Sequence, residues 1–176
     1  MQKRIVALAA LMVVALATMG VVAAAADPPA QDENWLMTSI SGDRFEIAGG
    51  KIALSKASVP AVRTLAHRLI VDHTKSLHDA VQLALRWGLK PPPAATPSEQ
   101  WELNRLRYMP KSWFDAQYSA LEVKDHNQDI EETGFEARKG SAPDIRREAL
   151  KDLPMLNLHL RLSKAAAKAA DAAAQS

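Results

Sequence analysis

Apolar residues recur at helical spacing along most of the chain, and the clearest case is segment 58–88. Pro60 near its start and Gly88 at its end are residue types typical of a helix start and stop. One face of this segment is apolar apart from one histidine and one serine: Val62, Leu65, Ala66, Leu69, His73, Ser76, Leu77, Ala80, Leu83, Ala84 and Trp87. The pattern predicts a long amphipathic helix with His73 on its core face.

A second long helix is predicted for residues 31–56, where Leu36, Ile40, Ile47 and Leu54 repeat at helical spacing. Glu46 is expected to point away from the apolar centre of this helix. Three glycines inside the segment each cost about 1 kcal/mol relative to alanine, so we expect a close helix approach or a local kink there. These glycines are Gly42, Gly49 and Gly50.

The next stretch contains three consecutive prolines, 91–93, and then a capping box from Thr96 to Glu99 with a proline in the first turn. A short helix to residue 109 should follow. Ser112 and Asp115 are interpreted as the N-cap pair of a helix that ends near residue 140. A last helix opens near Pro143 and bends at Pro154, and its alanine-rich end, residues 165–176, should fray.

Four long helices with a long connection between the second and third predict an all-α, four-helix bundle of the ferritin-like kind across residues 33–164. The segment 88–96 in extended form reaches roughly 28 Å, so this connection can run the length of the bundle. An up-down-up-down arrangement with the short helix folded back stays open. No segment reads as a strand.

The first residues resemble a targeting segment. Lys3 and Arg4 precede an apolar run, 5–22, and alanines 24–26 match a signal peptidase site. We expect residues 1–26 to be a signal peptide cleaved near Ala26, residues 27–32 to be flexible, and the mature protein to be periplasmic or secreted. The alternative is an uncleaved membrane anchor, since the run could just cross a bilayer. No other segment could span a membrane.

Composition excludes several functions. Residues 1–26 hold two of the 22 basic and none of the 20 acidic residues, so the mature chain has a formal charge of zero. A neutral chain lacks the basic surface that nucleic-acid binding requires. The chain has no cysteine, which excludes disulfides and thiolate chemistry. No serine stands in a nucleophile elbow, and no glycine-rich loop could hold a phosphate.

Several short motifs resemble the exported bacterial family called domain of unknown function 4142. They are Phe45-Glu46-Ile47, Asp72-His73-Thr74-Lys75, Phe114-Asp115 with Tyr118, His126, Leu153-Pro154 and His159-Leu160. The resemblance covers about residues 33–164, and the Asp-His pair and the last Pro and His are its most specific parts. It implies a ferritin-like fold and an envelope location, and it implies no activity.

Metal binding is the chemistry that the histidines suggest. A ferritin-like di-iron centre needs Glu-x-x-His motifs, but Ile70, Val123 and Leu156 occupy the positions three before His73, His126 and His159. A di-iron centre is therefore disfavoured. A mononuclear site for a divalent transition metal stays open, and its candidate ligands are His73, His126, His159, Glu122 and Asp72, with Asp115, Asp129 and Asp152 on neighbouring positions.

Each candidate also has a structural interpretation. A single histidine on an apolar face is more often a core residue hydrogen-bonded to a neighbour, and we favour this for His73. Asp72 lies to one side of the apolar stripe, where it could orient a histidine of another helix. Asp115 is interpreted first as a capping residue. His67 and His78 should be exposed to solvent.

Two functional hypotheses follow. The favoured one is a non-enzymatic envelope or stress-related protein that acts through a surface, by binding a protein partner or by self-association. The alternative is a metal-binding or metal-dependent redox protein with a reduced ferritin-like site. Four tryptophans lie near predicted helix ends or in the connection between the second and third long helices. Tryptophans at such positions usually cover the ends of the apolar core, whereas a cluster of exposed tryptophans would indicate a partner-binding surface.

Overall fold

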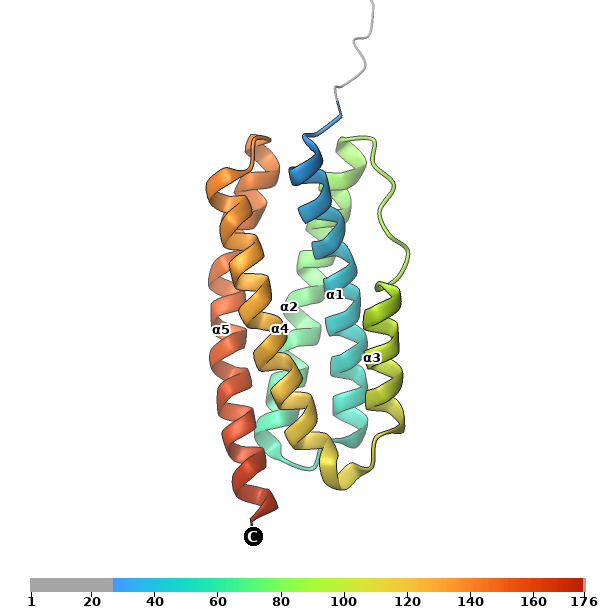
Figure 1. Cartoon of the computed structure of the whole chain (residues 1–176), viewed down its shortest axis with the longest axis vertical. Coiled ribbons are helices and arrows are strands. Elements are labelled where there is room, and N and C mark those ends of the chain that lie inside the picture. Colours follow the sequence, from blue (N-terminus) through green and yellow to red (C-terminus); the bar gives the residue numbers. More distant parts are fainter. Residues whose placement is uncertain (1–26, 176) are drawn as a thin grey trace, which may run out of the picture.

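The computed structural model describes residues 27–175, and these residues form five α-helices and no strand (Figure 1). The predicted all-α class is confirmed. The predicted signal peptide, residues 1–26, lies outside the described part. The helices are α1 (Ala30–Lys56), α2 (Pro60–Arg86), α3 (Pro97–Tyr108), α4 (Lys111–Lys139) and α5 (Pro143–Ala174).

The four long helices lie side by side along the long axis, as two antiparallel hairpins (Figure 1). Helices α1 and α2 form the first hairpin, and α4 and α5 form the second; α2 packs on α5, and α1 packs on α4. Between the hairpins the chain returns along the outside through residues 87–96 and α3, which packs against α1. Helices α2 and α4 therefore run in the same direction, so the long connection crosses the molecule from end to end.

The interior consists of two apolar clusters with polar residues between them. One cluster includes Val62, Leu65, Phe114 and Ala166, and the other includes Leu36, Ile40, Leu83, Ile145 and Ala149. Buried polar side chains occupy intermediate positions along the same helices: Asp43, Glu46, His73, Glu122, His126 and His159. Burying so many polar groups is unfavourable unless each one finds a partner.

Helix ends confirm two of the predicted signals and correct a third. The Thr96–Glu99 capping box is present, and Gly88 has a φ of 72°, which favours glycine. Helix α4, however, begins at Lys111 without a side-chain cap, so the predicted Ser112–Asp115 cap is wrong. Asp115 faces inward, and its Oδ2 accepts hydrogen bonds from the backbone N–H and hydroxyl of Ser58 and from the N–H of Val59.

The glycines of α1 differ in their surroundings. A Cβ at Gly50 would lie 2.8 Å from Cγ1 of Ile70 and 3.0 Å from the carbonyl oxygen of Ala66. The close approach of α1 to α2 therefore requires a residue without a side chain at this position. At Gly42 an added Cβ would meet no atom within 4 Å. The predicted close approach is confirmed for Gly50 and does not hold for Gly42.

Helix α5 continues to Ala174, through the segment that was expected to fray. Ala166 and Ala170 are buried in the first apolar cluster. Small side chains at these positions bring the helix close to its neighbours, and this packing stabilises the end that propensity alone would leave loose. No helix among the described residues is long and apolar enough to cross a membrane.

Candidate metal centre

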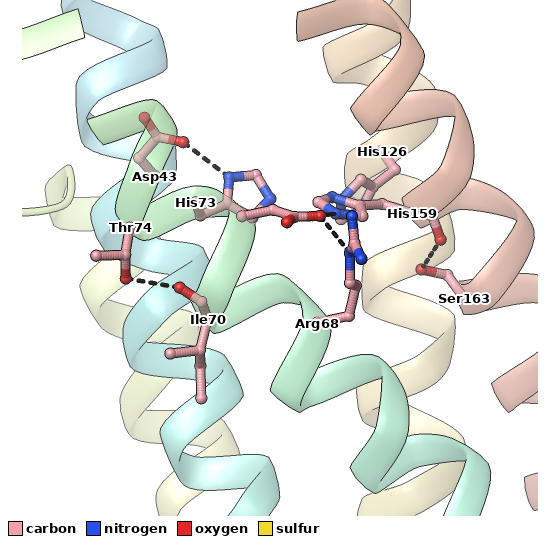
Figure 2. Close-up of polar contacts among 9 residues, drawn as sticks. Asp43, Arg68, Ile70, His73, Thr74, His126, His159 and Ser163 are labelled. Atoms are coloured by element: carbon pink, nitrogen blue, oxygen red, sulfur yellow. Dashed lines mark hydrogen bonds and ion pairs between the residues drawn. The ribbon is translucent and has the colours of Figure 1, made fainter. Parts of the chain in front are cut away.

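Three buried histidines meet at the centre of the polar layer. His73 comes from α2, His126 from α4 and His159 from α5, and their side chains are almost fully inaccessible to solvent. The ring centroids lie 5.0 to 5.9 Å apart. Figure 2 shows the three rings gathered between the helices. One nitrogen of each ring lies within 4.8 Å of one nitrogen of each other ring.

In two of the rings, the nitrogen that points away from the other histidines, which we call the outward nitrogen, is hydrogen-bonded to an oxygen that can only accept. This nitrogen therefore carries the proton of the ring. Nδ1 of His126 donates to the backbone carbonyl of Glu122, 2.9 Å away. Nε2 of His159 lies 2.8 Å from Oδ2 of Asp72. Burial alone would raise the pKa of Asp72, but hydrogen bonds from His159 and Arg68 hold it below its usual value. Asp72 is therefore ionised and accepts the proton of His159.

The third ring is held by a buried carboxyl group of α1. Nδ1 of His73 lies 2.7 Å from Oδ1 of Asp43, on the side away from the other histidines (Figure 2). A hydrogen bond of this length holds one shared proton between the two atoms, and burial raises the pKa of Asp43 well above its usual value. Nε2 of His73 has no hydrogen-bond partner. A cation bound at Nε2 would keep the shared proton on Nδ1.

These contacts leave ring lone pairs directed at one another. Burial lowers the pKa of His126 to about 3 and those of His73 and His159 to about 4, so the rings are neutral at neutral pH. The protons of His126 and His159 lie on their outward nitrogens. Their inward nitrogens are only 3.3 Å apart. With the protons on the outward nitrogens, these two atoms present lone pairs to each other.

This distance matches the geometry of a metal site. Two nitrogens that each lie 2.0–2.1 Å from a tetrahedral zinc ion are about 3.3–3.4 Å apart. Metal-binding histidines also usually donate their other ring N–H to a carboxylate or a backbone carbonyl. All three rings meet an oxygen of one of these two kinds. His126 and His159 therefore have the spacing of two ligands of one cation, and a nitrogen of His73, within 4.8 Å of both, is placed to approach as a third.

An acidic cavity leads to the histidines. It has a volume of about 100 Å³ and reaches His73. Its acidic lining residues, which we call the acidic vestibule, are Asp43, Glu99, Asp125, Asp129, Glu132 and Asp152. No lysine or arginine is among the described residues that line it. Burial raises the pKa of Asp43, Asp125, Asp129 and Asp152. A cation that enters would favour the ionised form of these carboxyl groups, so the cavity would favour the entry of cations.

The other predicted candidates serve different contacts. Asp72 orients His159 from another helix, as predicted. The Glu122 carboxylate belongs to a second group with Glu46 and a nitrogen of His126. Asp129 and Asp152 line the acidic vestibule, and Asp115 binds the start of α2. His67 and His78 are exposed, as expected.

Sequence reasoning missed Asp43 and misplaced Glu46. Glu46 was expected to point away from the core, but it is 1% exposed, and Asp43 is 4% exposed. The signal for Asp43 was present, because it lies three positions after Ile40 and four before Ile47, on the same helical stripe. An acidic residue on an apolar stripe of α1 could have been paired with the histidine on the stripe of α2.

Comparisons with known proteins agree with this fold. A family model described as "Domain of unknown function (DUF4142)" matches residues 17–168. Among solved structures, the crystal structure of a DUF305 fragment from Deinococcus radiodurans is similar, with a TM-score of 0.71 and 14% sequence identity. The match covers 81% of this chain and 99% of that chain, and at this identity it shows the fold alone. The comparison with curated proteins finds no match.

Proposed function

The chain belongs to the family of domain of unknown function 4142, whose name states no activity, and we propose that it binds one transition-metal ion through His73, His126 and His159. This was the alternative hypothesis from the sequence. The convergence of the three imidazoles makes it the stronger one, because packing alone does not require three histidines from three helices to meet.

One observation carries the proposal. The inward nitrogens of His126 and His159 are 3.3 Å apart, and the outward nitrogens of both rings donate to oxygen acceptors. In a core that served only packing, one ring would donate a proton to the other. Here a cation between the lone pairs supplies the missing attraction, and His73 adds a third lone pair through Nε2.

Three imidazole ligands favour a metal ion that is intermediate between hard and soft. Imidazole suits zinc, copper, nickel and iron, and three histidines with one open position are typical of zinc sites that keep a water molecule or another small ligand. The acidic vestibule reaches the site beside His73, so such a ligand could approach from that side. The proposed function is binding of Zn²⁺, or of another ion that accepts the same geometry.

We further propose that the helices form a ferritin-like bundle with one crossover. The parallel direction of α2 and α4 and the likeness to the DUF305 fragment support this. The proposed centre differs from a ferritin-like di-iron centre because its closest ligands are three imidazoles without Glu-x-x-His motifs. Buried ionisable residues such as those of the proposed centre do not by themselves stabilise a bundle, so we attribute them to metal binding.

Export also belongs to the proposal. The basic residues, apolar run and alanines of residues 1–26 support cleavage near Ala26 and a periplasmic or secreted location. The mass of the protein isolated from an expressing bacterium tests this. Loss of residues 1–26 is expected, and a full-length chain held in the inner membrane would contradict it.

Metal analysis tests the proposed centre. The protein is purified without a histidine tag, equilibrated with Zn²⁺, Cu²⁺, Ni²⁺, Co²⁺ or Fe²⁺, and freed of excess metal before the bound ions are counted. We expect one zinc ion per chain, and less than about one tenth of that in His73→Ala and His159→Gln at the same free zinc. With Co²⁺ we expect the visible absorption of a tetrahedral site.

His67→Ala is the matched control, because His67 lies on the same helix as His73 but is exposed. This variant should bind as much zinc as the original protein. Equal zinc binding by His73→Ala and the original protein would refute the proposed site. So would the absence of stoichiometric binding of any of the five ions.

A second role, association through a surface, is favoured by three exposed aromatic side chains. Trp101 and Tyr108 of α3 are 63% and 83% exposed, and Trp113 at the start of α4 is 67% exposed. Exposed aromatic residues are enriched in binding surfaces. Sedimentation velocity of the original protein and of Trp101→Ser tests this role. A monomer at all concentrations in both would exclude self-association.

A further inference from the structure

A second group of buried ligand atoms lies beside the histidines, and it is built from oxygen. We propose that Glu46 of α1 and Glu122 of α4 bind a second cation, a hard divalent ion that prefers oxygen ligands. This site goes beyond the histidine centre, and its carboxylate ligands are not among the ligands of the first ion, although His126 lies within reach of both groups. Neither carboxylate takes part in the hydrogen bonds that fix the three rings.

The carboxylates meet where the protein offers them little compensation. Glu46 and Glu122 are each 1% exposed, and their ligand oxygens lie within 4.8 Å of each other and of a nitrogen of His126. Neither oxygen of Glu46 makes a hydrogen bond of good geometry, nor does Oε2 of Glu122, and the polar groups that face them are the carboxyl group of Asp125 and the hydroxyl of Tyr118. Burial raises the pKa of Glu46 well above its usual value and that of Glu122 to about 8. Buried carboxylates are normally paired or bound to a metal. A cation between them supplies the missing partner for both.

Tyr118 provides an independent indication of a ligand. Its side chain is fully buried, and its hydroxyl lies near the carboxyl group of Glu122 but makes no hydrogen bond of good geometry. Tyr118 precedes Glu122 by one helical turn on α4, and its hydroxyl faces the carboxylates of Glu122 and Glu46. A buried hydroxyl without a partner is unusual in proteins. A cation at the carboxylates gives this oxygen an interaction as well.

The basic side chains of the protein do not fill this role. Asp72 has Arg68 beside it, and Asp79 has both Lys75 and Lys151. Among the described residues, no ion pair with a lysine or arginine includes Glu46 or Glu122. Glu122 has only a 3.6 Å contact with Nδ1 of His126, and that nitrogen already donates to a backbone carbonyl.

The oxygen atoms determine which ions would bind. Carboxylate and other oxygen ligands suit magnesium, calcium and manganese, whereas imidazole suits zinc and copper. The two neighbouring sites would therefore select different ions. Asp125 connects the second site to solvent, because it faces Glu46 and also lines the acidic vestibule.

Manganese is the probe for this site, because free and bound Mn²⁺ are distinguished by electron paramagnetic resonance. The purified protein is titrated with Mn²⁺, first alone and then with the histidine site loaded with zinc. We expect one Mn²⁺ per chain in both titrations. Glu46→Gln and Glu122→Gln should each weaken manganese binding by at least about tenfold and leave zinc binding at one ion per chain.

A measurement of thermal unfolding distinguishes the loss of a metal ligand from misfolding of the variant. Glutamine has nearly the same shape as glutamate and removes a buried charge, so both variants without metal should unfold at the same temperature as the original protein or a higher one. Glu136→Gln is the matched variant, because Glu136 is also on α4 and 1% exposed but hydrogen-bonds to Gln31. It should bind manganese as the original protein does.

His159→Gln separates this proposal from the histidine centre. We expect this variant to lose zinc and to keep manganese. If zinc does not bind to any form while manganese depends on Glu46, the histidine centre is refuted and the oxygen site stands. The oxygen site is overturned if the original protein binds no manganese, if Glu46→Gln binds it equally well, or if manganese is lost from His159→Gln.

Discussion

The carboxylate of Asp72 lies 2.8 Å from Nε2 of His159, although 87 positions separate the two residues in the sequence. The neighbouring residue His73 pairs with Asp43 of α1 instead. Two adjacent positions of α2 therefore act on different rings: one supplies a ring, and the other holds the ring of another helix in place. A carboxylate beside a histidine in sequence is here not that histidine's partner.

Replacing Asp72 by asparagine should weaken zinc binding without unfolding the protein. The amide keeps an oxygen acceptor for Nε2 of His159 but lacks the charge that raises the basicity of the ring. Loss of such a partner typically reduces metal affinity by about 10–100-fold. Competition with a chromophoric chelator measures the change. Asp79→Asn is the control, since Asp79 lies on the same helix and pairs with Lys75 and Lys151; an equal loss in this control would contradict the assignment.

Two substitutions of Asp43 should separate hydrogen bonding from burial. Asp43→Asn retains an acceptor for Nδ1 of His73 and should reduce zinc affinity less than Asp43→Leu, which leaves that nitrogen without an acceptor. Isothermal titration of both variants measures the order. The reverse order, or equal zinc affinity in both variants and the original protein, would show that Asp43 does not orient the ring.

Asp152 should make the metal-free protein less stable as the pH rises. Burial, together with the nearby charge of Glu148, raises its pKa from 3.8 to about 7, so the folded state holds a proton that the unfolded state releases. This contribution is fully present below about pH 4 and is lost as the pH rises through about 7. Asp152→Asn should therefore be more stable than the original protein by roughly 2–4 kcal/mol at pH 8.

Urea unfolding at pH 4, 6 and 8 tests the sign for Asp152. The advantage of Asp152→Asn should be greatest at pH 8 and small at pH 4. Asp171→Asn serves as the control, because Asp171 is exposed near the end of α5. A difference that grows toward acid pH would contradict the prediction.

The glycines of α1 give a paired stability test. Gly50→Ala should destabilise the protein by about 1–3 kcal/mol, because the new methyl group would overlap Ile70 and the carbonyl of Ala66. Gly42→Ala should stabilise it by about 0.5–1 kcal/mol, because a helical glycine in open space has only an entropic cost. Thermal unfolding measures both. Equal effects would mean that α1 and α2 do not approach closely at Gly50.

Much of the fold could be predicted because the relevant signals are local. The apolar stripe of α2, the capping box of Thr96 and the stop at Gly88 each depend on residues within a few positions of one another. The topology could not be predicted in this way, since the proline-rich connection permitted a crossover or a fold-back. The cap assigned to Asp115 failed for a related reason: the N–H groups that it binds are 56 and 57 positions away.

The candidate site was predictable in its ligands and less so in its partners. His73, His126 and His159 could be selected as single histidines in separate helices, and the sideways position of Asp72 indicated its role. Asp43 and Glu46 were missed because α1 carries several polar residues on inward faces, which weakens the apolar pattern that defines its core side. The packing of α1 against α2 and α4 decides which acidic residue contacts which histidine. This packing cannot be predicted from residues that are close together in the sequence.

The three histidines are divided unequally between the two hairpins: His73 belongs to the first, and His126 and His159 belong to the second. An ion bound to all three would add a cross-link between segments that are otherwise joined by packing, by hydrogen bonds and ion pairs such as Asp72–His159 and Asp79–Lys151, and by the long connection. Neither hairpin alone carries enough of the ligands to hold it. Metal would therefore add to the cohesion between the two parts of the chain, so that separating them would require breaking a coordination bond as well as exposing apolar surface.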